Sequence, residues 1–256
     1  MKTYVVANQK GGIGKTTTAT ALASILVDLG YKTLLIDADM QGNSTDTYRG
    51  KIEGECTLYD VLLEDDKDRV SINEAIQHTE VGDIIASDPL LRRADSILDA
   101  DRANGMYRLK DAIDELKGYD YVIIDTAPTI NSILQNCLIA ADEIIVPLTA
   151  DRYGIQGLSD LHETIQATKK RQNPKLNVAG LLLIKYKSRT LLDREVKDTL
   201  EKIANKMNTK VFETKIRESV KAKEAQAMRT TLNKYNKKCT TYEDYTNFVE
   251  ELLSEQ

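Results

Sequence analysis

The chain has 256 residues, of which 41% are hydrophobic, and its formal net charge at pH 7 is −5. A chain of this length and apolar content can bury the core of one sizeable α/β domain, which excludes an intrinsically disordered protein. No apolar run reaches the ~18–20 residues that span a membrane, and the N-terminus lacks the apolar stretch of a signal peptide, so we expect a cytoplasmic protein.

Short apolar runs alternate with helical patterns along the chain. Strands are predicted at residues 3–8, 32–37, 83–87, 119–126, 143–149, 178–184 and 209–214. Helices are predicted at residues 15–29, 106–117, 131–140, 155–171, 189–207 and 243–253. Strands rich in Val, Ile and Leu that alternate with helices are typical of a parallel sheet covered on both faces. The pattern therefore predicts an α/β fold with a doubly wound, mostly parallel sheet, formed by one domain at residues 1–256, with ligands bound beyond the carboxyl ends of its strands.

The first predicted strand is followed by NQKGGIGKTT, residues 8–17. This stretch nearly matches the phosphate loop G-x-x-x-x-G-K-[ST], but Gln9 stands at the first glycine and Lys10 adds a second positive charge. Glycines in such a loop let backbone N–H groups approach phosphate oxygens, and the following helix points its positive dipole end at them. Lys15 should reach the β- and γ-phosphates, and the Thr16 hydroxyl should bind Mg²⁺. The predicted nucleotide-binding residues of the loop are Lys10, Gly11, Gly12, Ile13, Gly14, Lys15, Thr16 and Thr17.

The longer stretch ANQKGGIGKTTTA resembles the deviant phosphate loop of the SIMIBI-class P-loop ATPases. It is similar to the ParA-type (Soj-like) DNA partition ATPases. The resemblance implies ATP and Mg²⁺ as cofactors, a weak intrinsic ATPase activity and a homodimer that forms on ATP binding. It also implies that Lys10 reaches across the dimer interface to the phosphates of the partner, so Lys10 and Lys15 are both candidate catalytic residues.

Two further segments place carboxylates at or just beyond the ends of predicted strands. LLIDADMQGNST contains Asp37 and Asp39 and resembles the family switch D-x-D-P-Q-G, with Met40 in place of the proline. The resemblance implies that Asp39 activates the attacking water near Mg²⁺, while we expect Asp37 to be a strand-end residue tied to the loop. YDYVIIDTAP resembles the second switch, DTPP, and its strand ends at Asp125, the usual position for a carboxylate that holds Mg²⁺ through water. The predicted metal-binding residues are Thr16, Asp39 and Asp125.

The resemblance continues more loosely through the later chain. PLTADRYGIQGLSDL would bring Asp151 and Arg152 near the nucleotide or the dimer partner, and YKSRT retains Arg189 and Thr190 of the family segment Y-D-G-R-T. IRESVKAKEAQ resembles I-P-R-N-V-R-x-S-E-A-P, which in this family often helps hold adenine. Arg217 stands at the first proline of that segment and is predicted to bind the cofactor.

Positive charge is concentrated late in the chain. Residues 169–238 hold 20 lysines and arginines against 7 aspartates and glutamates. Such a concentration attracts polyanions even when the total charge is negative. In the family that the chain resembles, the ATP-bound dimer binds DNA without sequence preference on the nucleoid, and hydrolysis stimulated by a centromere-binding, ParB-like partner releases it. The DNA-binding candidates are Arg189, Lys221 and Lys223.

Three related interpretations stay open. A MinD-like membrane-cycling ATPase would need a C-terminal amphipathic helix with a basic polar face, whereas TTYEDYTNFVEELLSEQ has an acidic one, so we expect no membrane partner. A metal-carrier ATPase of the iron-protein type would need cysteines placed to bridge a cluster, whereas Cys56, Cys137 and Cys239 are widely separated. A scaffold that binds nucleotide without hydrolysing it would have no use for Asp39.

Overall fold

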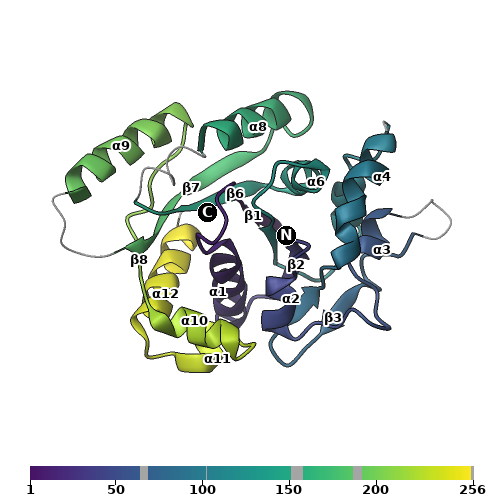
Figure 1. The fold of residues 1–256 in the computed structure, drawn as a ribbon, viewed down its shortest axis with the longest axis horizontal. Coiled ribbons are helices and arrows are strands. Elements are labelled where there is room, and N and C mark those ends of the chain that lie inside the picture. Colours follow the sequence, from purple (N-terminus) through teal and green to yellow (C-terminus); the bar gives the residue numbers. More distant parts are fainter. Residues whose placement is uncertain (64–68, 102, 151–157, 187–191, 255–256) are drawn as a thin grey trace.

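The structure is a computed structural model that describes residues 1–63, 69–101, 103–150, 158–186 and 192–254. Within these ranges, eight strands form one sheet in the order β3-β4-β2-β5-β1-β6-β7-β8 (Figure 1). All neighbouring pairs are parallel except β3 and β4. The strands are β1 Lys2–Val6, β2 Thr33–Ala38, β3 Ile76–His78, β4 Asp83–Ile85, β5 Tyr121–Thr126, β6 Glu143–Leu148, β7 Asn177–Tyr186 and β8 Ile216–Arg217. The predicted α/β fold with a mostly parallel sheet is confirmed.

Helices cover both faces of this sheet, because successive side chains of a strand point to opposite sides. In β1, Val5 packs into the core on one face, whereas Tyr4 and Val6 pack into the core on the other. The described helices are α1 Lys15–Asp28, α2 Asn43–Tyr48, α3 Leu58–Leu63, the 3₁₀ helix η1 Pro89–Arg93, α4 Ala94–Ala100, α5 Arg108–Asp114, α6 Ser132–Ala140, α8 Leu158–Arg171, α9 Leu192–Lys206, α10 Val220–Ala227, α11 Leu232–Asn236 and α12 Thr240–Leu253.

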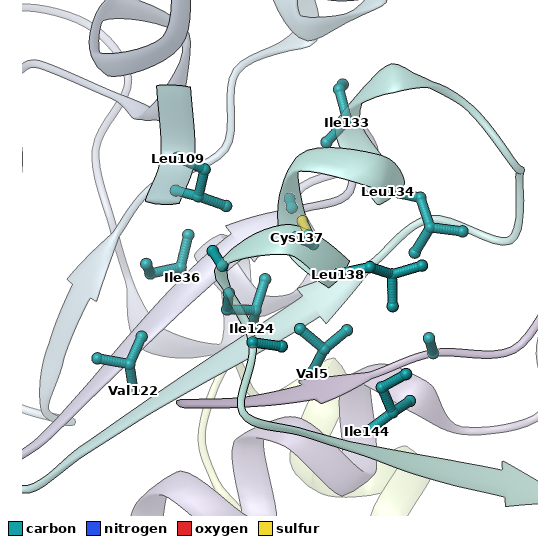
Figure 2. Packing of buried hydrophobic residues seen from close by; sticks show 14 of the residues in the cluster. Val5, Ile36, Leu109, Val122, Ile124, Ile133, Leu134, Cys137, Leu138 and Ile144 are labelled. Carbon is teal, nitrogen blue, oxygen red and sulfur yellow. The ribbon is translucent and has the colours of Figure 1, made fainter. Parts of the chain in front are cut away.

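One core lies between the sheet and the helices α3 to α9. Figure 2 shows α6 on the central strands, with Leu134, Cys137 and Leu138 packed against Val5 and Ile124. The Cys137 side chain is fully buried here. The predicted apolar helix therefore uses this cysteine as a packing residue, which is its common role when buried.

The second core lies on the opposite face, where α1 packs against the C-terminal helices α10, α11 and α12 (Figure 1). The apolar side of α12 is buried, with Tyr245, Phe248, Val249 and Leu252 all in this core. Phe248 meets Phe212 edge to face, with ring centroids 4.9 Å apart. The helix that a membrane-cycling ATPase would need as an anchor is thus a structural part of this fold.

The prediction of a strand at residues 209–214 was wrong. Val211 makes only an isolated bridge to Leu181, and the strand that pairs with β7 at this edge of the described sheet is β8, which follows the segment. Phe212 is nonetheless buried, and its ring covers Gly180, where an added Cβ would lie 2.6 Å from it. The apolar residues of the segment therefore serve packing rather than strand pairing.

The strands of the sheet lie between residues 2 and 217 of the chain, and the last helix ends at residue 253. That residues 1–256 form one domain stays a prediction. Across the described ranges, no helix is both long and apolar enough to cross a lipid bilayer.

Candidate functional site

A cavity of about 430 Å³ lies where the carboxyl ends of the central strands meet the start of α1. This is the edge at which parallel α/β sheets bind ligands. The cavity brings together residues from loops that are far apart in the sequence. The predicted site residues that line it are Gly11, Gly12, Ile13, Gly14, Lys15, Thr16, Thr17, Asp39, Arg217 and Lys223.

The phosphate loop, residues 8–17, owes its shape to its glycines. Gly12 and Gly14 have φ values of +68° and +113°, in the left-handed region that residues with a Cβ rarely adopt. At Gly14 a Cβ would also lie 3.1 Å from the side chain of Ile184. The buried Asn8 fixes the entrance, since its Oδ1 accepts from the Lys10 N–H at 3.0 Å and its Nδ2 donates to the Pro147 carbonyl.

The two signature lysines of the loop have different surroundings. Lys15 is only 6% exposed, and its Nζ donates to the Lys10 carbonyl at 3.3 Å. Burial lowers the pKa of Lys15, while the charges of Asp125 and Asp39 act to raise it. The Lys10 ammonium instead contacts the Thr149 hydroxyl, beyond β6, at 3.2 Å. Lys15 therefore lines the cavity of its own chain, and Lys10 lies beside it.

Asp37 and Asp125 are direct neighbours in the sheet, paired in register between β2 and β5, and both are fully buried. Asp37 accepts hydrogen bonds from the Thr45 N–H at 2.7 Å, the Thr45 hydroxyl at 2.8 Å and the Asp39 N–H at 3.2 Å. These bonds tie Asp37 to Thr45 of α2 and to the residue just beyond its own strand. Burial, and next the charge of Asp125, raises the pKa of Asp37.

Asp125 keeps one oxygen without a protein partner. Its Oδ2 accepts from the Ser44 hydroxyl at 2.8 Å, whereas Oδ1 is buried and has no hydrogen-bond partner among the residues described here. Burial raises the pKa of Asp125, and the hydrogen bond from Ser44 is the first of the influences that oppose that shift. Asp125 is not among the described residues that line the cavity, and that it holds Mg²⁺ stays a prediction.

Asp39 lies just beyond β2 and lines the cavity with 7% of its surface exposed. Its backbone carbonyl accepts from the Ser87 hydroxyl at 2.6 Å, and its Oδ1 accepts from the Gln41 N–H at 3.0 Å. These bonds hold a carboxylate at the cavity wall although the loop has Met40 in place of the family's proline. The Met40 side chain itself is 43% exposed.

The predicted residues of the later chain have mixed positions. Arg217 lines the cavity, but its guanidinium binds Asp244 of α12, with Nε 2.9 Å from Oδ2, and Glu243 at 3.1 Å. Lys221 forms an ion pair with Glu224 at 2.7 Å. Arg217 stands in place of the family's proline, and its guanidinium is hydrogen-bonded to two carboxylates of α12 in the chain without nucleotide. Arg189, Thr190, Asp151 and Arg152 lie outside the described residues.

Two side chains that contact the phosphate loop were not predicted from the sequence. The Lys185 Nζ donates to the Gly12 carbonyl at 2.6 Å, and the Gln226 Nε2 donates to the Thr17 hydroxyl at 3.1 Å. Both line the cavity. Lys185 could have been found from its place at the carboxyl end of an apolar strand, but nothing local marks Gln226.

Comparison with known proteins gives the chain its family. A family model described as an AAA domain matches residues 1–178. The chromosome partitioning protein ParA of Caulobacter vibrioides is 33% identical, over 100% of this chain and 95% of the relative. The chromosome-partitioning ATPase Soj of Treponema pallidum is 31% identical, over 99% of this chain and 97% of the relative. The chain belongs to the ParA/Soj family of AAA-domain ATPases.

A solved structure similar to this ParA/Soj-type chain contains a nucleotide. Cobyrinic acid a,c-diamide synthase from Mycobacterium smegmatis, with bound ADP and magnesium, is 29% identical and has a TM-score of 0.83, over 100% of this chain and 95% of that one. The same protein has also been solved with an ATP analog and magnesium. The predicted family, the ATPase class and the cofactors ATP and Mg²⁺ are confirmed by these comparisons.

Proposed function

We propose that this ParA/Soj-type ATPase segregates DNA through a nucleotide-dependent dimer. Two chains close on ATP and Mg²⁺, the dimer binds DNA without sequence preference, and hydrolysis stimulated by a centromere-binding, ParB-like partner releases it. The observation that carries the proposal is the cavity itself, in which the glycine-shaped loop, Lys15 and Asp39 meet beside the buried Asp125.

The residues present fit a magnesium ion. We assign its binding to the Thr16 hydroxyl, at the start of α1, and to Asp39 and Asp125 through water. The unpaired Oδ1 of Asp125 supports this assignment, because a carboxylate that only served the fold would have both oxygens satisfied. When bound, Mg²⁺ supplies positive charge that offsets the negative charge of the triphosphate.

The chain's own groups then have separate tasks in hydrolysis. The N–H groups of the loop and the Lys15 ammonium hold the phosphates, where they stabilise the charge that develops during transfer. Asp39 orients the attacking water and accepts its proton, since it is a carboxylate held at the cavity wall by the Gln41 N–H. Among the described residues, the other carboxylate that lines the cavity is Glu218, the neighbour of Arg217 in the chain.

The dimer proposal rests on Lys10 and on the loops beside it. Lys10 is not among the described residues that line the cavity of its own chain. Its ammonium instead contacts the Thr149 hydroxyl. Met40 and Ile130 follow the carboxyl ends of the neighbouring strands β2 and β5, and 43% and 46% of their surfaces are exposed. A second copy over this edge would cover both apolar side chains and bring its own Lys10 to the phosphates.

The DNA proposal rests on the basic segment, residues 169–238, and on the burial of α12. Exposed lysines of this segment include Lys202 and Lys206 on α9. Lys221 is paired with Glu224, but an exposed pair is worth only about 0–1 kcal/mol and can yield to a DNA phosphate. Arg189, Lys221 and Lys223 stay the proposed contacts, and Lys223 also lines the nucleotide cavity. The apolar side of α12 is used in the core, which favours DNA over a membrane as the partner.

The proposal is tested by DNA binding in ADP, in ATP and in a non-hydrolysable ATP analogue across a salt series. Retention should require the triphosphate, because the dimer joins two basic surfaces, and the logarithm of the binding constant should fall linearly with the logarithm of salt concentration. Equal retention in ADP and in ATP, or retention that ignores salt, would contradict the proposal.

A further inference from the structure

Lys185 has an unusual backbone conformation at the edge of the cavity. It lies near the end of β7, where the pairing with β8 shifts register between Ile184 and Tyr186. Its φ is +53°, in the left-handed region that few residues other than glycine, asparagine and aspartate adopt. Bulges of this kind re-aim a side chain, and strained residues of this kind gather at ligand sites.

The re-aimed side chain contacts the phosphate loop. The Lys185 Nζ lies 2.6 Å from the Gly12 carbonyl oxygen, although 173 positions separate the two residues. Both residues line the cavity. A carbonyl oxygen is the negative end of a peptide dipole, so alone it repels a phosphate. With an ammonium hydrogen-bonded to it, the same point of the wall becomes attractive to an anion.

The residue before Lys185 holds the same loop by packing. The Ile184 side chain lies against Gly14, close enough that a Cβ there would be 3.1 Å away. Two consecutive residues of β7 therefore fix the loop at two points, one by an apolar contact and the other by a charged hydrogen bond. The Lys15 ammonium, by comparison, bonds within the loop to the Lys10 carbonyl.

We propose that Lys185 is a positioning residue of the nucleotide site. Its ammonium fixes the peptide between Gly12 and Ile13 and offsets the charge of the Gly12 carbonyl, so that the loop is ready for phosphate before nucleotide enters. The inference rests on ATP binding at this loop, as in the proposed function. Because ADP and ATP both place phosphates in the loop, affinity for both nucleotides depends on Lys185.

The test is equilibrium binding of ADP and of ATP with Mg²⁺, measured by calorimetry on the full chain. Lys185→Met removes the ammonium and keeps the length of the side chain, and it should raise both dissociation constants about tenfold, the typical effect of losing a charged hydrogen bond. Lys185→Arg retains a donor and should stay within about threefold of the unmodified chain. The matched control is Lys32→Met, which removes an exposed lysine just before β2, at the opposite end of the strands.

A glycine variant separates the ammonium from the backbone. Lys185→Gly relieves the strain at φ +53°, so its melting temperature without nucleotide should equal or exceed that of the unmodified chain. Its affinity for both nucleotides should still fall about tenfold, because the ammonium is gone.

Two results would overturn the inference. One is unchanged affinity of Lys185→Met for both nucleotides, and the other is full affinity in Lys185→Gly, which would assign the effect to the backbone alone. If the unmodified chain itself bound no ATP, the proposed function would fail instead, so the two failures are distinguishable in one set of titrations.

Discussion

The adjacent carboxylates of Asp37 and Asp125 differ in their hydrogen-bond partners, and this difference indicates different roles. Asp37 and Asp125 are paired in register and fully buried, so position alone does not distinguish them. Asp37 accepts two hydrogen bonds from Thr45 of α2 and one from the Asp39 N–H just beyond its own strand, which makes it a structural anchor for both residues. Asp125 keeps an unpaired oxygen. The hydrogen-bond partners, rather than the motif, therefore separate the anchor from the proposed metal ligand.

Asp39→Ala should reduce ATP hydrolysis by about 10²-fold or more, the usual contribution of a positioned general base, while ATP binding is retained. The removed carboxylate leaves the phosphate loop intact, so the ATP-bound form should persist. Phosphate release and nucleotide retention after rapid desalting measure the two effects. The matched control is Asp46→Ala, an exposed carboxylate in α2 that does not line the cavity. Normal turnover in Asp39→Ala would refute the role assigned to Asp39.

At the level of elements, local sequence patterns predicted the features that lie within one contiguous segment. They did not predict contacts between segments that are far apart in the sequence. The phosphate loop and the strand ends at Asp39 and Asp125 were predictable, because a strand, its turn and its carboxylate are contiguous in the sequence. The contact of Lys185 with Gly12 spans 173 positions, and the partner of Arg217 lies 27 positions away on α12. The strand prediction at residues 209–214 was wrong for the same reason, since only the tertiary structure shows that Phe212 packs over Gly180.

Phe248→Ala in α12 should lower the free energy of unfolding by about 3–5 kcal/mol, the cost of emptying a fully buried aromatic site. The loss should appear in urea unfolding of the chain without nucleotide, because Phe248 packs against Phe212 and α1 rather than against the cavity. Asn247→Ala, an exposed neighbour on the same helix, should change stability by less than about 0.5 kcal/mol. A Phe248→Ala chain of unchanged stability would mean that α12 is not part of the core.

For the whole molecule, the arrangement of charge and apolar surface supports the proposed nucleotide-dependent dimer. Lys10 lies beside its own cavity, and the exposed Met40 and Ile130 follow neighbouring strands at the same sheet edge. The net charge of −5 combines a strongly basic stretch at residues 169–238 with an acidic remainder. Closing two chains over the nucleotides would cover the apolar loops and double the basic surface offered to DNA.

Lys10→Ala should remove ATP-dependent dimerisation and leave measurable nucleotide binding, because the loop glycines and Lys15 remain on each chain. ATP titration by calorimetry and sizing in the presence of nucleotide separate the two properties. Lys32→Ala, which removes an exposed lysine far from the cavity, is the matched control and should dimerise normally. Dimerisation of Lys10→Ala at the concentration that suffices for the unmodified chain would rule out the role of Lys10 across the interface.

Sedimentation velocity of the unmodified chain with Mg²⁺, in ADP and in a non-hydrolysable ATP analogue, tests the central claim most directly. If ATP closes two chains into a dimer, a species of twice the monomer mass should form in the analogue and not in ADP. A chain that stays monomeric in saturating analogue and Mg²⁺ at every protein concentration would contradict it.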